Sequence, residues 1–368
     1  MDGVDVAVLR TDGHATVEKM FAAEYAYDPV FKAKLEQGLE DAANLTREAP
    51  RNEKLIALEE EITQHHIAAV RQVLKTLNLT SDRIDLIGFH GQTVLHRPND
   101  AFTVQLGDGQ KLADETGISV VYDMRSNDMA NGGQGAPLVP VFHQALARTI
   151  HERLPQNLKS LLPVAFVNIG GISNISVLCP DQQTVGFDTG PGNALMDAWS
   201  LRERGLAYDE SGNWARSGKV IPELLSALLE DPYFKRSYPK STGKEHFNLH
   251  WLDSKLNTSM DATDVQATLV ELTAQTIVDS STQACNAIDE VYICGGGAKN
   301  DYLMQRLSTL FSPVVVGTTD DLGVNADWVE AMAFAWLARQ TLLGLPGNLP
   351  AVTGASGLRV LGAIYPAG

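Results

Sequence analysis

Val164-Ala-Phe-Val-Asn-Ile-Gly-Gly-Ile-Ser-Asn-Ile-Ser-Val-Leu178 contains two apolar runs that a pair of glycines separates. Residues 164–169 and 172–178 predict two adjacent strands, and Gly170-Gly171 predicts the turn between them. Because glycine has no Cβ atom, the backbone N–H groups of such a turn can come close to a phosphate. An ordinary hairpin turn explains the same residues, so this segment alone leaves both interpretations open.

Strands, glycine turns and helices alternate on both sides of this segment. Such alternation is typical of an α/β protein, in which ligands bind beyond the ends of the strands. The two halves share this architecture, although no short-period sequence repeat relates them. Beyond the two strands above, we expect a hairpin over 4–21, strands over 85–89, 102–106, 118–122, 184–187 and 291–294, a loop over 126–137, and helices over 52–77, 110–116, 138–150, 194–204, 262–288 and 326–343.

The composition excludes several classes of protein. A length of 368 residues favours two domains, with a candidate boundary in the polar, proline-containing stretch 154–163. A formal net charge of −16 argues against nucleic acid or an anionic membrane as the main partner. The chain contains no apolar run long enough for a membrane span, and its first residues do not resemble a signal peptide.

The chain contains three cysteines, Cys179, Cys285 and Cys294. A disulfide scaffold would need more cysteines and an even number of them, so this count does not indicate one. None belongs to a CxxC pair, so we expect no zinc site and assign no metal ligands among the side chains. This cysteine usage fits a reducing cytosol best.

The segment Gly186-Phe-Asp188-Thr-Gly190-Pro-Gly192-Asn193 places one carboxylate at the end of a predicted strand, among residues that constrain the backbone. An aspartate in such a place can take a proton from an attacking hydroxyl or water, and we interpret Asp188 as a general base. The alternative is that Asp188 caps the helix that follows.

Five further segments carry polar or glycine residues near predicted strand or helix ends. Three of them also have a structural interpretation: an ion pair for Arg125 and Asp128, a neutral side chain for His90, and a carboxylate that complements a helix dipole for Glu330. The polar stretch Tyr238–Asn248 could close over a ligand. The other segments are His90-Gly-Gln92, the loop with Arg125, Asp128 and Gly132–Pro137, Ile293-Cys-Gly-Gly-Gly-Ala-Lys-Asn300, and Trp328-Val-Glu330.

Taken together, these motifs resemble those of the anhydro-N-acetylmuramic acid kinases, a family of the actin/sugar-kinase superfamily. NIGGISN, GFDTGPGN, ICGGGAKN, GFHGQTVLHRP and DMRSNDMANGGQGAPLVP occur in the family's order, and the resemblance extends over nearly the whole chain. It implies an α/β fold with two ribonuclease-H-like domains around a central nucleotide cleft. We expect residues 1–157 with 345–368 to form the N-terminal domain and residues 158–344 to form the second.

The resemblance also implies a reaction and a set of site residues. ATP, as a magnesium complex, would phosphorylate the 6-oxygen of 1,6-anhydro-N-acetylmuramic acid while water opens the anhydro ring, in peptidoglycan recycling in the cytoplasm. Asp188 would activate that water, and a homodimer is suggested by the resemblance alone. We expect Gly170, Gly171, Ser173, Asn174, Gly295, Gly296, Gly297 and Asn300 to bind the nucleotide, and His90, Gln92, Arg125, Asp128, Gly190, Asn193 and Glu330 to bind the sugar.

The sequence departs from the family pattern at two places. First, Asn127 occupies a position at which the family loop has an arginine. Second, Met1-Asp2-Gly3 corresponds to the last part of the family's N-terminal motif GxMSGTSxDGxD. The phosphate-facing turn and the first strand of the N-terminal domain are therefore missing, and we expect a natural start further upstream. The alternative functions are a nucleotide-binding protein that this loss has impaired, and another sugar kinase of the superfamily.

Overall fold

The computed structural model describes residues 3–14, 16–48, 51–153, 163–179, 184–257 and 259–368. The chain forms two compact units: unit 1 contains Met1–Thr149 and Glu330–Gly368, and unit 2 contains Ile150–Val329. The predicted boundary between residues 157 and 158 lies outside the described residues. The chain returns to unit 1 at residue 330, and the sequence-based prediction placed that return at residue 345.

Unit 2 is built on a five-stranded sheet with the strand order β11-β10-β7-β8-β9. Strands β7, β8 and β9 run antiparallel in sequence order, whereas β10 pairs parallel with both β7 and β11. The strands are β7 (Val164–Ile169), β8 (Ile172–Leu178), β9 (Val185–Pro191), β10 (Glu290–Cys294) and β11 (Val315–Thr318).

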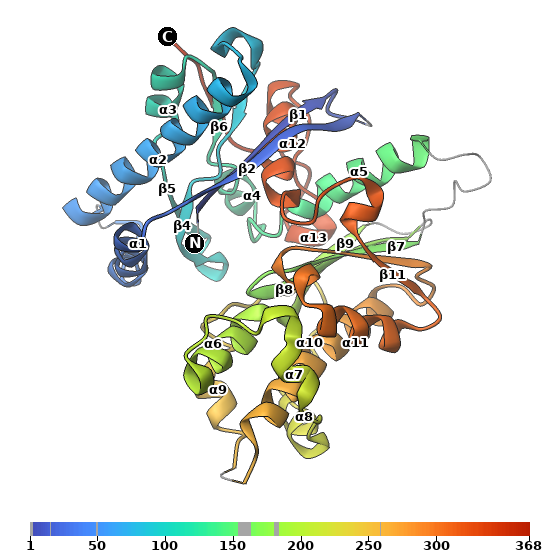
Figure 1. Cartoon of the computed structure of the whole chain (residues 1–368). Helices are drawn as coiled ribbons and strands as arrows, with labels where there is room; N and C mark the ends of the chain where they lie inside the picture. The colour runs from blue at the N-terminus through green and yellow to red at the C-terminus, as the bar shows by residue number, and fades with distance from the viewer. Residues whose placement is uncertain (1–2, 15, 49–50, 154–162, 180–183, 258) are drawn as a thin grey trace. The chain divides into compact units, whose positions relative to one another are not determined.

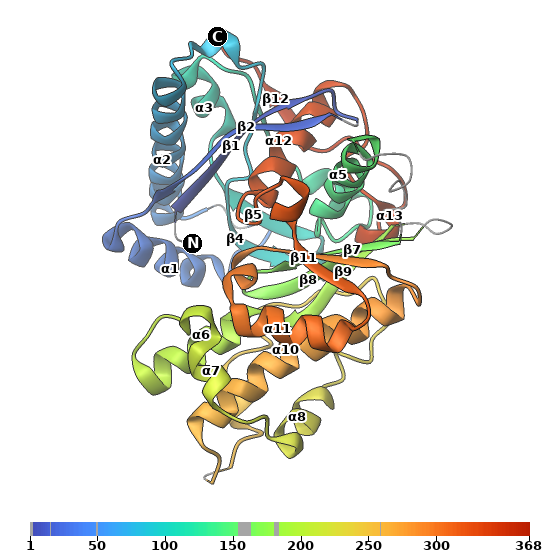
Figure 2. The ribbon, with the colours of Figure 1, turned by 45° about the vertical axis from the view of Figure 1, so that its right-hand side comes forward.

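Helices α10 and α11 pack on one side of this sheet (Figures 1 and 2). Most of α10 is buried, and its first N–H groups are capped by Asp261, whose carboxylate accepts from the Thr263 N–H at 2.8 Å. The apolar sides of sheet and helices form one core, which includes Phe187, Leu269 and Ile293. The helices are α6 (Asn193–Arg204), α7 (Asn213–Ser217), α8 (Pro222–Leu229), α9 (Leu249–Asp253), α10 (Ala262–Ala284) and α11 (Asp301–Phe311).

A disulfide joins Cys179, just after β8, to Cys285, just after α10, while Cys294 is buried and belongs to no disulfide among the described residues. The cysteine count did not predict this bond, because the two residues are 106 positions apart and only the packing of α10 against the sheet brings them together.

Unit 1 carries its strands in three separate sheets. Strands β1 and β2 form an antiparallel hairpin, which confirms the predicted hairpin, and β3, β6 and β12 form a sheet of order β12-β6-β3. The predicted strand over 85–89 is reduced to two residues. The strands are β1 (Gly3–Thr11), β2 (Val17–Ala26), β3 (Ile87–Gly88), β4 (Gln92–Arg97), β5 (Phe102–Leu106), β6 (Val120–Tyr122) and β12 (Ala363–Tyr365), with β4 pairing with β5.

The long helix α2 (Figure 1) contributes Leu55, Leu58 and Ile62 to the hydrophobic core of unit 1. Asn52 caps its start and Asn78 ends it in the left-handed conformation, which matches the predicted helix over 52–77. The predicted loop over 126–137 contains the short helix α4, so that prediction was wrong for its first five residues. The helices are α1 (Pro29–Ala42), α2 (Glu53–Leu77), α3 (Gly109–Thr116), α4 (Ser126–Ala130), α5 (Val139–Arg153), α12 (Val329–Leu342) and α13 (Pro350–Thr353).

Among the described residues, no helix has both the length and the apolar character that crossing a membrane requires.

A buried ion pair links α10 to α11 in unit 2. Arg306 donates from Nε and Nη2 to the two carboxylate oxygens of Glu271, at 2.6 and 2.9 Å, and Glu271 is only 7% exposed. We expect Arg306→Met to lower the free energy of unfolding by about 3 kcal/mol, because it leaves a buried carboxylate without its partner. Urea unfolding followed by tryptophan fluorescence measures this, since Trp199 and Trp251 lie in unit 2.

The double variant Arg306→Met/Glu271→Met is the matched control. It removes both charges and should recover most of the loss. A double variant as unstable as Arg306→Met would show that packing of the arginine stem, and not the charge, carries the effect.

Candidate active site

Asp188 lies within β9, where it pairs across the sheet with Asn174 of β8. Its backbone N–H donates to the Lys240 carbonyl at 3.2 Å, and the Tyr233 hydroxyl donates to the Asp188 carbonyl at 2.6 Å. One carboxylate oxygen, Oδ2, accepts from the Thr242 backbone N–H at 2.9 Å. The segment between α8 and α9 therefore packs against Asp188 and fixes its position.

The surroundings of Asp188 favour its protonated form. Burial raises the pKa of Asp188 to about 7, and the negative charge of Glu245 adds to this shift, while the Thr242 N–H works against it. The side chain nevertheless keeps part of its surface accessible. A carboxylate with a pKa near neutrality that can still reach a ligand is suited to accept a proton.

The Gly170-Gly171 turn is attached to the start of α6 by backbone hydrogen bonds. The Gly171 carbonyl accepts from the N–H groups of Gly192 and Ala194 at 3.0 and 3.1 Å, and the Gly170 carbonyl accepts from Asn193 at 2.7 Å. A Cβ atom at Gly192 would overlap the Gly170 carbonyl, so this approach requires glycine. The turn is thus more than a simple hairpin connection, because it also holds the helix that follows β9.

The triple glycine follows β10 and lies beside the end of the neighbouring parallel strand β7. Gly295 has a φ of 77°, and a Cβ atom at Gly297 would overlap the Ile169 side chain. The Cβ position of Gly296 is 3.5 Å from the Asn193 side-chain nitrogen, which itself donates to the Ile169 carbonyl at 3.0 Å. The structure therefore brings the two glycine turns and Asn193 together at the carboxyl ends of β7 and β10.

The other predicted residues of unit 2 differ in what their side chains do. Ser173 is fully buried, and its hydroxyl has no hydrogen-bond partner among the residues that the structure describes. Asn300 caps α11: its side-chain oxygen accepts from the Leu303 N–H at 3.0 Å. Its side chain therefore stabilises the start of that helix. Gly190 has a φ of 147° and pairs with Ser173, and a side chain there would meet Phe234.

Sequence analysis missed three titratable side chains of unit 2. Lys244 lies across the Gly170-Gly171 turn, where a Cβ atom at Gly171 would overlap its side chain. Its positive charge acts on Asp197 of α6, whose pKa burial raises to about 6. Lys240 is 6% exposed between the rings of Phe187 and Tyr233, and burial lowers its pKa. The polar stretch Tyr238–Asn248 was the only sequence signal for the two lysines.

In unit 1, Arg125 and His90 form a direct contact. The Arg125 guanidinium donates from Nη2 to His90 Nε2 at 2.8 Å and from Nη1 to the Gly135 carbonyl at 2.7 Å. Burial, together with the charge of Arg125, lowers the pKa of His90 to about 3. His90 is therefore neutral at physiological pH and acts as an acceptor that orients the arginine.

Asp128 is fully buried, and its oxygens are occupied by internal donors. Oδ1 accepts from the Asn348 amide and the Thr353 hydroxyl, both at 2.7 Å, and Oδ2 accepts from the Gly135 N–H at 2.8 Å. This arrangement ties the glycine loop that follows α4 to the segment around α13.

The two remaining predicted residues of unit 1 occupy element ends. Glu330 is exposed in the first turn of α12, and its charge acts on Arg125. Gln92 begins β4, and its side chain donates to the Thr93 carbonyl at 3.2 Å. Of the residues predicted for the sugar site in this unit, His90 contacts Arg125, and the charges of Glu330 and Asp128 act on Arg125.

Groups of three or more histidine, cysteine, aspartate or glutamate side chains that could hold a metal ion do not occur among the described residues.

Comparisons with known proteins place the chain in a class of sugar kinases. Residues 1–367 match the family described as anhydro-N-acetylmuramic acid kinase. A protein of that name from Pasteurella multocida is 46% identical over all of this chain and 94% of its own length. Another from Pseudomonas putida is 52% identical over 81% of this chain and 80% of its own.

The chain therefore belongs to the anhydro-N-acetylmuramic acid kinase family, as its motifs indicated. A third relative of that name, from Aliivibrio fischeri, is 46% identical over the whole chain and 96% of its own length. A solved structure of the activator of 2-hydroxyisocaproyl-CoA dehydratase from Clostridium difficile, with bound ADPNP, overlaps 65% of this chain and 85% of that one. Its 13% identity and TM-score of 0.33 make it too distant to bear on function.

The raised pKa of Asp188 makes the stability of the protein depend on pH. Between about pH 4 and pH 7 the folded state keeps a proton that the unfolded state releases, so the free energy of unfolding falls as the pH rises. We expect Asp188→Asn to remove this slope and to be more stable than the parent by about 4 kcal/mol at pH 8, with little difference at pH 4. Urea unfolding at the two pH values measures it.

Asp289→Asn serves as the control, because Asp289 is an exposed carboxylate of the same unit. It should leave the pH dependence unchanged. An Asp188→Asn protein with the parent's slope would show that Asp188 titrates as an ordinary aspartate.

Proposed function

We propose that this protein uses ATP to phosphorylate the 6-oxygen of 1,6-anhydro-N-acetylmuramic acid while water opens the anhydro ring. The products are N-acetylmuramic acid 6-phosphate and ADP. The observation that carries the proposal is Asp188, a partly accessible carboxylate whose pKa is raised to about 7, in the strand that pairs with β8. Membership of the kinase family supports the same reaction.

The proposed role of Asp188 is to accept a proton from the attacking water. The water oxygen then bonds to the anomeric carbon, and the bond from that carbon to the 6-oxygen breaks. The released 6-oxygen attacks the γ-phosphorus of ATP, and ADP leaves. Thr242 and Tyr233 hold Asp188 in place through its carboxylate and its carbonyl, so these contacts keep the base oriented.

We further propose that the two glycine turns bind the nucleotide. Without Cβ atoms, Gly170, Gly171 and Gly295–Gly297 let a phosphate or a flat base come close to the backbone. The unpartnered Ser173 hydroxyl is a buried donor in the strand that follows the first turn. Asn174, opposite Asp188, would add an amide, whereas Asn300 would act by capping α11.

The residues present fit a magnesium ion that arrives with ATP. Mg²⁺ takes oxygen ligands and commonly binds through one or two carboxylates together with phosphate oxygens and water, so it needs no cluster of protein ligands. Asp197, in the same helix α6 whose start is tied to the glycine turn, would supply a carboxylate. When bound, the ion would neutralise charge on the phosphates.

For the sugar, we propose contacts from the residues that the family resemblance assigns to it. Arg125, oriented by the neutral His90, presents a guanidinium for the carboxylate of the muramic acid, and Gln92 and Glu330 would bind hydroxyl or amide groups. Gly190 and Asn193 would contact the sugar near Asp188. Asp128 would act indirectly, since its oxygens are used in holding the glycine loop. Dependence on ATP supports a cytoplasmic location, and a homodimer stays a prediction from the family resemblance.

ADP release with Mg-ATP and 1,6-anhydro-N-acetylmuramic acid, compared with a control without sugar, tests the proposed function directly. Sugar-dependent release is the expected result. Binding of ATP without sugar-dependent release would contradict the proposal and would favour an impaired nucleotide-binding protein.

The pH dependence of turnover should report on Asp188. Because the base acts only when deprotonated, kcat should rise with pH and level off above about pH 7. Asp188→Asn should lower kcat by about 10²–10⁴-fold and lose this acidic limb, while ATP still binds. Steady-state ADP release from pH 5 to pH 9 measures both; a variant within about tenfold of the parent rate would exclude Asp188 as the base.

Lys244 should bind phosphate at the Gly170-Gly171 turn. We expect Lys244→Met to raise KM for ATP about tenfold, a loss of one charged contact, with a smaller effect for Lys244→Arg. The control is Lys235→Met, which removes an exposed lysine from the same segment. Equal KM values for the Lys244→Met and Lys235→Met proteins would contradict this role.

A further inference from the structure

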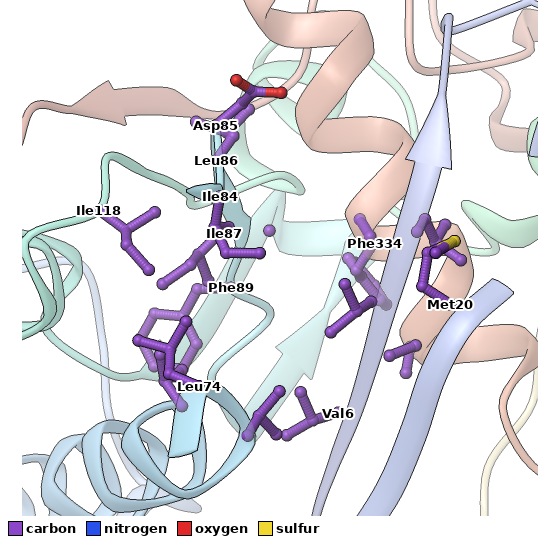
Figure 3. Close-up of a pocket in the computed structure, with 18 of the residues that line it drawn as sticks. Val6, Met20, Leu74, Ile84, Asp85, Leu86, Ile87, Phe89, Ile118 and Phe334 are labelled. Carbon is purple, nitrogen blue, oxygen red and sulfur yellow. The ribbon is translucent and has the colours of Figure 1, made fainter. Parts of the chain in front are cut away.

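Two features of the structure have no part in the proposed reaction: an apolar cavity in unit 1 and a network of hydrogen bonds around Asp231 in unit 2. The cavity has a volume of about 640 Å³, and Val6, Ile87 and Phe334 are among its mostly apolar lining residues (Figure 3). Such side chains neither donate nor accept protons. The network around Asp231, in contrast, leads to Asp188.

Asp231 lies just after α8, and three groups contact its carboxylate. Oδ1 accepts from the Tyr233 backbone N–H at 2.9 Å, and Oδ2 accepts from the Trp251 indole N–H at 2.8 Å. Oδ2 also lies 3.1 Å from His246 Nε2, which donates to it when that nitrogen carries the proton. The Asp231 side chain is 9% exposed; burial raises its pKa, but the hydrogen bonds outweigh burial and lower the pKa overall. Asp231 is therefore an ionised anchor at neutral pH.

The three groups come from both ends of the segment that connects α8 to α9. Tyr233 stands near its start, His246 stands near its end, and Trp251 belongs to α9. The ring of the buried Phe247 packs edge-to-face against Tyr233 and Trp251, with 5.6 and 5.0 Å between ring centroids. The Asp231 carboxylate therefore closes this segment into a loop over an aromatic core.

The closed loop, residues 231–246, contacts Asp188 at three points. The Tyr233 hydroxyl donates to the Asp188 carbonyl at 2.6 Å, and the Asp188 N–H donates to the Lys240 carbonyl at 3.2 Å. The Thr242 N–H donates to the carboxylate oxygen Oδ2 at 2.9 Å. Tyr233 is the direct link, since its N–H is bonded to the carboxylate that closes the loop and its hydroxyl to Asp188. Tyr233 is 1% exposed, so it cannot move far without losing one of these bonds.

We propose that Asp231 is a positioning residue for the reaction: by closing the 231–246 loop, it holds Asp188 in the orientation in which the carboxylate accepts a proton. Asp231 acts through Tyr233 and Thr242 and not by contact with the reacting atoms. Asp188 is a base only in the proposed function, on which this inference rests.

The Thr242 N–H decides how release of the loop would change Asp188. Burial raises the pKa of Asp188, the Thr242 N–H lowers it, and the negative charge of Glu245 raises it. If the loop opens, the carboxylate loses a donor that favours its charged form, and its pKa rises. Loss of the Asp231 charge by itself would lower the pKa of Asp188, because it removes a negative charge. The direction of the shift therefore separates release of the loop from a direct charge effect.

Asp231→Asn tests this proposal, because it keeps the size of the side chain and replaces one acceptor oxygen by a donor group. We expect the plateau value of kcat to fall about tenfold, since Asp188 loses its orientation, while KM for ATP stays at the parent value. The acidic limb of kcat should move to higher pH by about one unit. ADP release from pH 5 to pH 10 measures both.

The matched control is Asp253→Asn. It removes a carboxylate of α9, in the same unit, that pairs with Arg202 at 2.7 Å. This protein should keep the kcat and the acidic limb of the parent.

A second readout does not require activity. Carbon NMR of the Asp188 carboxyl group, assigned by the loss of its signal in Asp188→Asn, follows the titration of Asp188 directly. We expect its pKa to be about one unit higher in Asp231→Asn than in the parent, and unchanged in Asp253→Asn. Absence of sugar-dependent ADP release in the parent would refute the proposed function alone, whereas a raised pKa of Asp188 would still support the link to Asp231.

Two results would overturn the proposal. One is a pKa of Asp188 in Asp231→Asn that equals the parent's or lies below it. The other is a lower kcat without a shift of the acidic limb, which would show a general loss of structure and not the positioning of Asp188.

A second pair of variants applies if urea unfolding shows that Asp231→Asn does not fold. The amide nitrogen in His246→Gln can donate to Asp231 as Nε2 does, whereas the side chain in His246→Leu cannot. We expect the pKa of Asp188 to rise in His246→Leu and to stay near the parent value in His246→Gln. Equal values in the two proteins would overturn the proposal.

Discussion

The approach of the α6 N-terminus to the Gly170-Gly171 turn is the constraint on which unit 2 depends. Three backbone hydrogen bonds cross this contact, and glycine at position 192 is what makes it sterically possible. The contact fixes where β9 ends, and therefore where Asp188 stands in that strand. It also places Asn193 against the triple glycine after β10, so that one local interaction positions the base and both glycine turns.

Asp128 and Asp188 show how the surroundings decide what an aspartate does. Both lie beside glycine-rich segments, and both are largely surrounded by protein. Asp128 has donors on both oxygens, two of them from side chains, and holds a loop in place. Asp188 has one backbone donor and an unfavourable neighbour in Glu245, which leaves it able to take up a proton near neutral pH.

The sequence predicted the parts of the fold that local patterns determine. The strands β7, β8, β9 and β10 of unit 2, the hairpin over 4–21 and helix α2 follow from periodicity and turn residues, whereas β11 was not predicted. The motif resemblance correctly indicated the family. The sequence did not predict contacts between distant segments. The Cys179–Cys285 disulfide and the position of Lys244 across the Gly170-Gly171 turn arise only from packing. The predicted site residues include Asn300 and Asp128, whose side chains prove to be engaged in internal hydrogen bonds that no local pattern reveals.

Unit 1 is discontinuous, since its last 39 residues, Glu330–Gly368, follow the whole of unit 2. The donors that satisfy Asp128, Asn348 and Thr353, lie 220 and 225 positions further along the chain. At a synthesis rate of about 5–20 residues per second, the ribosome needs roughly 10–45 s to deliver them. Unit 2, encoded without interruption, can close its sheet during that interval. The order of translation thus separates the two halves in time, and the half that carries Asp188 is complete first.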